Sequence, residues 1–485
     1  MLEGIEAGTR AAELLAKGAP LQATLDVADP REWLALDAGV REIAWYRPQL
    51  LPEWEHSHPL PTDLTQLDES RLALALCHRD GRIRQEALVQ SVRYPGLLPL
   101  VVIRCADWAT PVRELAQDLL RAALDVGSAL ELAPLILRVG HRGRGAVGLD
   151  LLGRTLRRAS HGQLAVLFSA PDRTVRRFAY RLAVEGRLLP PAELARVAAQ
   201  DQDTVVQDLC ATAALAACAD LAARGDLAAR GDAEAYESVL APLLSARNPR
   251  TRSAGVTALR RAGRSQQAER FLGDRSGLVR ACARYVVRQH GDDPVAWYRE
   301  RCMARENPEL PPGAVIGLAE CGTRADASLL LPLLMHPVTG VRARAVAGLR
   351  ALDCGDMERL RPLLDDAAAA VVRETAVSLL PHAKELLADW LLERTDRERP
   401  RHVRVGAFRL LDARGGIVAL RAAVGLLEDP DVKLRAWAAQ SVQRWHPSPD
   451  GRRGDPEVGE LLDRCRHLFS DYVLRRRKWE AGVGS

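Results

Sequence analysis

The stretch from Val279 to Val442 repeats one short pattern at a spacing of 31 residues. Segments 279–287, 341–349 and 403–411 read VRACARYVV, VRARAVAGL and VRVGAFRLL. The fifth position of the pattern is alanine in every copy: Ala283, Ala314, Ala345, Ala376, Ala407 and Ala438. An apolar residue stands four positions before and four positions after each alanine. Apolar residues at this spacing form one stripe along an α-helix, so the stretch predicts a helix in every copy.

The alanine column also predicts how these helices pack. A small residue at the centre of the stripe lets a neighbouring helix approach closely. A second apolar segment, such as 327–335 or 417–427, separates successive striped helices. Each repeat is therefore predicted to be two antiparallel helices that bury their stripes by stacking on the next repeat. We expect an all-α fold, a right-handed α-α superhelix of about eleven to thirteen hairpins.

A fuller motif surrounds the column in the first half of the chain. Residues 80–87 read DGRIRQEA and residues 172–179 read DRTVRRFA, both of the form Asp-x-x-Val/Ile-Arg-x-x-Ala. This motif resembles the second helix of HEAT repeats, and the short period is similar to that of the HEAT-like repeats of phycobilisome lyases. The resemblance covers roughly residues 68–446 and implies an ARM-type solenoid. It implies little about activity, because many unrelated functions use this fold.

The register of the repeats divides the chain into three regions. Residues 1–67 do not follow it and are expected to form an N-terminal helical cap, with an aromatic, proline-rich stretch at 45–61 that is either part of this cap or a binding lip. Residues 68–446 hold the HEAT-like repeats. A tandem DLAARG duplication predicts a joint or loop at 218–236. Residues 447–485 are expected to form a C-terminal capping helix and a basic tail.

Composition narrows the classes of function. The net charge of +5 is small for 485 residues, so charge alone does not imply a nucleic-acid partner. Nine cysteines without a Cys-x-x-Cys pair indicate free thiols in a reducing compartment, and we expect a cytoplasmic protein. The first residues show no secretory signal, and no uncharged apolar run reaches the ~18 residues of a membrane span.

An arginine usually stands three positions before the alanine of the column, and we call it the column arginine. Members of this set are Arg84, Arg113, Arg176, Arg280, Arg342, Arg373, Arg404 and Arg435. In HEAT-like families this position commonly pairs with an acid at a turn of the neighbouring repeat. Aspartates recur at the predicted turns here: Asp80, Asp107, Asp172, Asp203, Asp274, Asp366 and Asp431. The resemblance therefore implies a ladder of ion pairs between repeats.

Other arginines of the second helices lie outside the apolar stripe. We take seven of them as candidate partner-binding residues: Arg121, Arg177, Arg181, Arg260, Arg284, Arg288 and Arg350. In a HEAT solenoid the second helices line the concave face, and most balancing acids are expected in turns and first helices. Three interpretations stay open: arginine-rich decoration of an exposed face, a groove for an acidic protein partner, and a groove for nucleic acid. We expect a non-enzymatic scaffold that binds a protein partner, with nucleic-acid binding as the alternative.

Motifs for chemistry are weak. Residues 143–148, GRGAVG, match a dinucleotide fingerprint, but Gly148 falls in the small-residue column and helices are expected on both sides. HEAT-like solenoids include bacterial alkylpurine DNA glycosylases, for which Asp107, Trp108 and Trp437 are the nearest candidates, in an arrangement unlike that family's pattern. We therefore expect no catalytic residue, cofactor or metal site.

Overall fold

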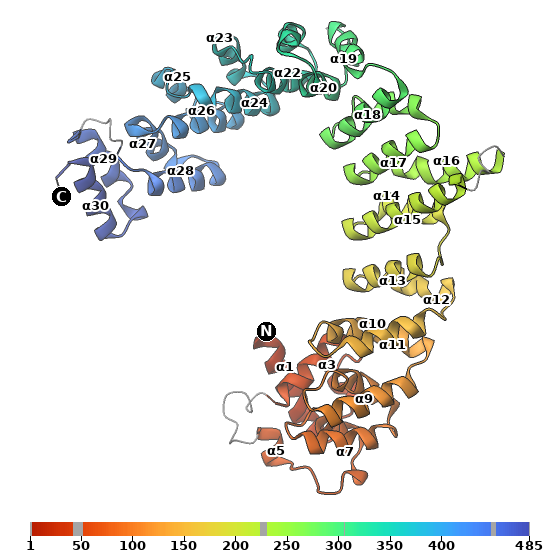
Figure 1. Cartoon of the computed structure of the whole chain (residues 1–485). Helices are drawn as coiled ribbons and strands as arrows, with labels where there is room; N and C mark the ends of the chain where they lie inside the picture. Colours follow the sequence, from red (N-terminus) through yellow and green to blue (C-terminus); the bar gives the residue numbers. More distant parts are fainter. Residues whose placement is uncertain (1, 42–51, 224–229, 305, 448–452, 485) are drawn as a thin grey trace. The chain divides into compact units, whose positions relative to one another are not determined.

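The computed structural model describes residues 2–41, 52–223, 230–304, 306–447 and 453–484 (Figure 1). Throughout these residues the regular structure is helical and no strand occurs, which confirms the predicted all-α superhelical repeat. The chain forms two compact units, unit 1 (Met1–Thr251) and unit 2 (Arg252–Ser485), which are described one at a time. The predicted joint at 218–236 includes residues 224–229, which lie outside the described residues.

Unit 1 begins with two helices that pack on each other, α1 (Leu2–Ala16) and α3 (Pro30–Gly39). Asp29 starts α3 by accepting the Arg31 N–H at 2.8 Å. The helices that follow are α6 (Glu69–Cys77) with α7 (Gly81–Ser91), α8 (Leu98–Arg104) with α9 (Thr110–Ala123), α10 (Val126–Gly140) with α11 (Ala146–Leu156), α12 (His161–Phe168) with α13 (Arg173–Glu185), α14 (Pro191–Gln200) with α15 (Thr204–Ala223), and α16 (Arg230–Ser245). The α1–α3 pair contacts α6, α8 and α10, the first helices of three successive hairpins.

A chain of buried charges fixes α3 against these hairpins. Arg104 of α8 donates to Asp37 of α3 and, at 3.0 Å, to Asp107. Arg84 of α7 donates hydrogen bonds to both carboxylate oxygens of the same Asp107, at 2.8 and 2.9 Å. Burial would raise the pKa of Asp37, but the charges of Arg104 and Arg41 hold it below its usual value. The N-terminal helices are therefore joined to the repeats by alternating charges as well as by apolar contacts.

The aromatic stretch near the N-terminus contributes to the core where it is described. Trp54, in the short helix α5 (Glu53–Ser57), is buried, and its Nε1 lies 3.4 Å from the Val40 carbonyl. Trp45, Tyr46 and Pro48 lie outside the described residues. Trp54 therefore has a structural role. The division of the whole chain into N-terminal cap, repeats and C-terminal capping helix stays a prediction.

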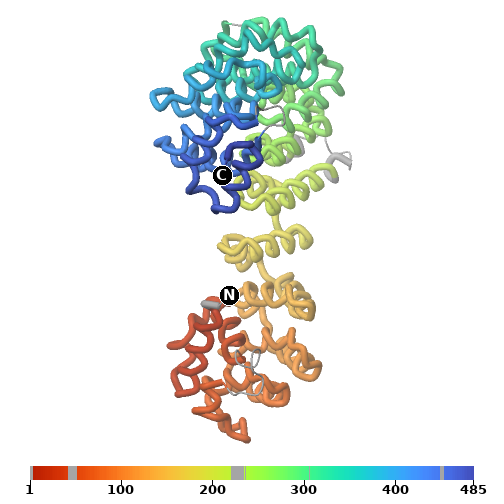
Figure 2. Tube along the Cα trace, turned by 90° about the vertical axis from the view of Figure 1, so that its left-hand side faces the viewer, coloured from red at the N-terminus to blue at the C-terminus, as the bar shows by residue number. Residues whose placement is uncertain are grey.

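Unit 2 continues the hairpins after α17 (Pro249–Arg261), which spans the boundary between the units. Its helices are η3 (Ser265–Phe271) with α18 (Gly277–His290), α19 (Pro294–Met303) with α20 (Pro312–Cys321), α21 (Ala327–Leu330) with α22 (Thr339–Ala351), α23 (Met357–Leu360) with α24 (Ala369–Leu379), α25 (Ala388–Glu393) with α26 (Arg401–Arg414), α27 (Gly416–Gly425) with α28 (Val432–Arg444), and α29 (Pro456–Arg464) with α30 (Asp471–Ala481). Within this unit the second helices α20, α22, α24 and α26 stack into one layer, and α23 and α25 lie in the other (Figures 1 and 2). The single helix expected near the C-terminus is two helices, because Ser470 caps the start of α30.

The alanine column lies in the contacts between second helices. Ala376 is 1% exposed, and the other five column alanines are fully buried, which confirms the predicted packing. The apolar positions four before and four after them are buried too, except Leu380, which is partly exposed. A Cβ added to Gly406 of α26 would stand 2.8 Å from Val372 Cγ1 and 3.8 Å from Ala376 Cβ. Helices α24 and α26 therefore meet where both side chains are small.

Column arginines link successive repeats through a recurring fork. Arg342 donates from Nε and Nη2 to both oxygens of Asp366, at 2.8 and 2.9 Å, and from Nη1 to the His336 carbonyl at 2.8 Å. Asp366 in turn accepts the Ala368 N–H at 2.7 Å and so shapes the start of α24. The same fork joins Arg84 to Asp107, and Arg252, three positions before the small residue Gly255, to Asp274. Arg404 makes a single contact with Asp429, at 3.3 Å, and not the fork. The predicted ladder is confirmed at these positions.

The ladder departs from the simple expectation at several places. Arg113 and Arg435 donate to the backbone carbonyls of Asp107 and Asp429 and form no ion pair in the described chain. Arg280 turns to Glu320 of α20, with Nε 3.1 Å from the carboxylate, and not to a turn aspartate. Asp203 accepts hydrogen bonds from Arg177, which follows the column arginine Arg176 in the sequence. Arg373 stays exposed and lies 3.7 Å from Glu374, the next residue of its own helix. The acid that pairs with each arginine therefore depends on which carboxylates lie near it and differs from one hairpin to the next.

Substitution of Ala376 by phenylalanine tests the buried column. Ala376→Phe should lower the free energy of unfolding by roughly 1–3 kcal/mol or more, because α24 and α26 leave no room for a ring. Ala436→Phe, at an exposed position of α28, serves as the control and should change the free energy of unfolding by less than about 0.5 kcal/mol. Urea unfolding followed by circular dichroism measures both. Equal midpoints for Ala376→Phe and the wild type would show that the column is not a packing contact.

Two arginines of the same column form a matched test of the ladder. Arg342→Met leaves the Asp366 carboxylate, 9% exposed, without its partner and should cost on the order of 3 kcal/mol of folding free energy. Arg373→Met, where the side chain has no such link, should cost about 0.5 kcal/mol or less. The two variants should thus separate clearly in thermal unfolding. A similar loss of stability in both variants would mean that the Arg342–Asp366 fork stabilises the fold no more than an exposed ion pair does.

Candidate partner-binding surface

The seven candidate arginines all lie on second helices, as predicted, but in both units. Arg121, Arg177 and Arg181 lie on α9 and α13 of unit 1. The other four lie on α17, α18 and α22, within unit 2. Their partners within the protein differ, and these partners decide which side chains stay available for another molecule.

Three of the seven pair with acids of a neighbouring hairpin. Arg177 donates to both oxygens of Asp203 at 2.9 and 3.1 Å. Arg284 reaches Glu320 at 2.7 Å, and only 12% of its side chain is exposed. Arg350 bonds the Glu374 carboxylate at 2.9 Å. These arginines hold adjacent hairpins together, so a partner that used their charge would have to compete with an internal acid.

Acids on the second helices reduce the predicted charge asymmetry. We expected most balancing acids in turns and first helices, whereas Glu320 lies on α20 and Glu374 on α24. Burial would raise the pKa of Glu320, but hydrogen bonds and charge from Arg280 and Arg284 hold it below its usual value. Both partners of the Arg284–Glu320 pair are therefore charged at neutral pH, and the pair adds no net positive charge to the layer.

The remaining four arginines form weaker contacts within the protein, or none. Arg121 pairs with Asp118 one turn away on its own helix, an arrangement that stabilises little. Arg260 donates to the Gln289 side chain at 3.3 Å. Arg181 and Arg288 are exposed, and within the described residues neither has an ion pair or a side-chain hydrogen bond. These two carry positive charge that no acid of the described chain neutralises.

One patch of unit 2 combines such an arginine with an exposed aromatic ring. Tyr285 of α18 is 47% exposed, and the Arg260 guanidinium lies 5.8 Å from the centre of its ring. Arg288 follows Tyr285 by three residues and so lies one turn along the same face of α18. We call Arg260, Tyr285, Arg288 and Gln289 the Tyr285 patch. It offers a flat apolar surface bordered by guanidinium groups, which suits contacts to both apolar and acidic side chains.

Sequence reasoning missed Tyr285. It stands two positions after Ala283, where the other copies have Ile316, Ala347, Ser378, Arg409 and Gln440. An aromatic residue at a position without a fixed type, in a chain with only 4% aromatics, is the signal that could have found it.

Of the residues considered for DNA repair chemistry, Asp107 and Trp437 have structural roles, whereas Trp108 is 64% exposed. Both oxygens of Asp107 accept hydrogen bonds from Arg84, and Asp107 also binds Arg104 and the Ala109 N–H at 3.0 Å. Its side chain is buried and has no access to a nucleobase. Trp437 packs on Phe408, with ring centres 4.8 Å apart. These contacts remove the candidate catalytic aspartate from the glycosylase hypothesis.

The glycine-rich segment 143–148 likewise has no nucleotide-binding context. It connects α10 to α11, and no strand precedes it in the described part of the chain. A Cβ on Gly148 would stand 3.7 Å from Ile136 Cγ2, so this glycine packs within its own hairpin as the column position predicts. Among the described residues, no three His, Cys, Asp or Glu side chains are placed to hold a metal ion. None of the described helices has the length and apolar character to cross a membrane.

Comparison with known protein families and with curated proteins gave no match. Solved structures with a similar helical arrangement include an engineered protein, with 18% identity over 77% of this chain and 97% of that one, and a TM-score of 0.22. Escherichia coli YibA matches with 12% identity over 60% and 96%, at a TM-score of 0.24. Kap95p, solved with RanGDP, matches with 12% identity over 97% and 67%, at 0.35. The all-α superhelical repeat fold follows from the packing described above.

Proposed function

We propose that this protein is a non-enzymatic helical-repeat scaffold that binds an acidic segment of a partner protein through its second-helix layer. The contact is centred on the Tyr285 patch of unit 2, and we place it on the concave side of the solenoid. The observation that carries the proposal is the exposed Tyr285 ring beside Arg260 and the unpaired Arg288. Tyrosine and arginine are the residue types most enriched among the residues that dominate protein–protein binding energy.

The helix beneath the patch is held rigidly. Val279, Ala283 and Val287 bury the opposite face of α18. Arg280 and Arg284 both bind Glu320 and fix α18 to α20. A partner therefore meets a surface that needs little reordering, which lowers the entropic cost of binding. In this proposal Arg284 and Arg350 position the helices, whereas Arg288 contacts the partner directly.

Unit 1 holds three of the seven candidate arginines, separately from the Tyr285 patch. Among the seven candidates, Arg181 of unit 1 is the other exposed arginine without a described partner, and we assign it a secondary role in attracting an acidic segment. Arg121 and Arg177 are already paired within the chain. In this proposal the charge of Arg181 acts on unit 1 alone, where it attracts acidic segments and so raises the rate of association more than the strength of binding.

An acidic protein segment suits this layer better than a nucleic acid does. Glu320 and Glu374 lie among the arginines and would repel a continuous phosphate backbone. An acidic peptide can place its carboxylates singly, against Arg288 and Arg260. Nucleic-acid binding also has a distinct signature, a steep and linear fall of log affinity with log salt concentration.

Affinity purification with the full chain as bait, in cells that encode it, tests the proposal. Arg288→Glu should weaken capture of the specific partner by roughly tenfold or more, because it sets a carboxylate against the partner's acids. Tyr285→Ala should weaken it by a similar factor. Arg399→Glu, an equal charge change at an exposed loop residue without a described side-chain partner, is the control and should leave capture unchanged.

Three outcomes decide the matter. Loss of the same acidic partner in both patch variants, with unchanged helical circular dichroism, supports the proposal. Equal recovery by Arg288→Glu and Arg399→Glu would refute the assigned surface. Retention of the wild-type chain on duplex DNA, lost steeply with salt and reduced by Arg288→Glu, would instead favour nucleic acid as the partner.

A further inference from the structure

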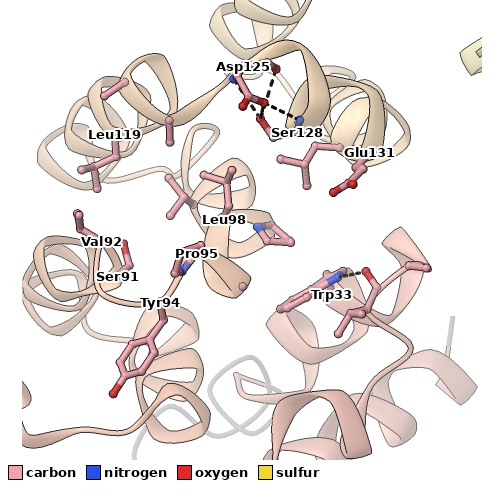
Figure 3. Close-up of a pocket in the computed structure, with 18 residues that line it drawn as sticks. Trp33, Ser91, Val92, Tyr94, Pro95, Leu98, Leu119, Asp125, Ser128 and Glu131 are labelled. Atoms are coloured by element: carbon pink, nitrogen blue, oxygen red, sulfur yellow. Dashed lines mark hydrogen bonds between the residues drawn. The ribbon is translucent and has the colours of Figure 1, made fainter. Parts of the chain in front are cut away.

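Unit 1 contains a cleft of about 990 Å³ that lies apart from the Tyr285 patch (Figure 3). It is bordered by the segment before α3, by α3 itself, by the C-terminal ends of α7 and α9, by the start of α8 and by the first turns of α10. All of these belong to unit 1. We call it the unit 1 cleft. It forms because the α1–α3 pair lies beside the repeats without filling the space next to α7 and α9.

Most of the cleft wall is apolar. Val92 and Leu119 border one side in Figure 3, and Leu98 lies between them and the other walls. Val92 is 69% exposed and lies at the rim of the cleft. The Trp33 indole N–H donates to the Val27 carbonyl at 2.9 Å, so this ring has no unmet polar group to offer a ligand. An occupant would therefore bury apolar side chains here.

The charged residues of the cleft are all of one sign and all on one wall. Asp125 and Glu131, at the start of α10, are the charged side chains in its lining, and no lysine, arginine or histidine joins them. Asp125 accepts the Ser128 N–H at 2.8 Å, and hydrogen bonds from the Ser128 backbone and side chain hold its pKa below the usual value. Glu131 is exposed and, among the described residues, has no ion pair. A chain with net charge +5 thus has an acidic edge on an apolar cleft.

We propose that the unit 1 cleft receives a basic amphipathic helix of a partner protein. The apolar face of that helix would lie against Leu98, Leu119 and Val92, and a lysine or arginine beside this face would meet Asp125 and Glu131. Helix-in-groove recognition uses this division between an apolar anchor stripe and a polar edge. The volume, about 990 Å³, lies within the range of ordinary binding pockets, about 300–1,000 Å³, and it is the acidic edge beside the apolar wall that favours a basic amphipathic helix.

A displayed library of helical peptides, selected on the full chain, tests this proposal. The selected peptides should carry apolar residues at helical spacing with lysine or arginine at the edge of that stripe. Affinity of the most enriched peptide is then measured by fluorescence anisotropy. Val92→Lys should weaken it by about tenfold through charge repulsion at the rim. Val89→Lys is the matched control, since Val89 is an exposed valine of α7, three residues before Val92, but does not border the cleft.

A second pair of variants isolates the acidic wall. Asp125→Asn with Glu131→Gln removes both charges while asparagine keeps the helix cap, and should weaken binding by roughly fivefold. Glu86→Gln with Glu114→Gln removes two exposed carboxylates of unit 1 outside the cleft and should change little. Arg288→Glu should have no effect, because the Tyr285 patch is a separate surface.

Each result bears on the proposal. Basic amphipathic peptides that lose affinity in Val92→Lys and in the Asp125/Glu131 double variant, but not in the controls, support it. Enrichment of no peptide, of acidic or uncharged peptides, or of peptides indifferent to the cleft variants would overturn it. Circular dichroism of every variant confirms that the helices remain folded.

Discussion

Close contact between neighbouring second helices is the constraint on which the rest of this structure depends. Ala345, Ala376 and Ala407 are buried where α22, α24 and α26 meet, and Gly406 brings two of these helices closer still. Each hairpin has too little apolar surface to be stable alone, so its stability comes from both neighbours. The small side chains set the distance between helices. That distance in turn decides which longer side chains can reach across.

Arginine side chains are long enough to span this distance between neighbouring hairpins. The planar guanidinium reaches a carboxylate of the next hairpin with two parallel hydrogen bonds and keeps a third for a backbone carbonyl, as Arg342 does. A lysine could not make all three contacts with fixed geometry. The same chemistry forms the buried chain from Asp37 through Arg104 and Asp107 to Arg84. The abundance of arginine is therefore in large part structural, and only the side chains left over can serve a partner.

The two surfaces proposed for binding arise from what the internal pairs leave unsatisfied. In unit 2 the acids Glu320 and Glu374 take up Arg284 and Arg350, so Arg288 beside Tyr285 remains available. In unit 1 the carboxylates Asp125 and Glu131 have no arginine facing them in the cleft. One surface suits an acidic segment and the other a basic helix. Together the two proposals assign an acidic partner segment to unit 2 and a basic one to unit 1.

The sequence by itself determined the hairpins, the buried alanine column and much of the arginine ladder. These features are periodic, and a period of 31 residues brings equivalent positions of adjacent repeats into contact whatever the details of the superhelix. Only the tertiary structure decided which arginines are free, because Arg284 meets Glu320 across 36 residues and Arg177 displaces the column arginine from Asp203. It also decided that Asp107 is buried between two guanidinium groups, and that a cleft opens beside α3. The pairing of individual arginines depends on side chains that differ from one copy of the repeat to the next, and the cleft depends on how α3, which lies outside the repeat register, packs against the repeats. A repeating pattern specifies neither of these.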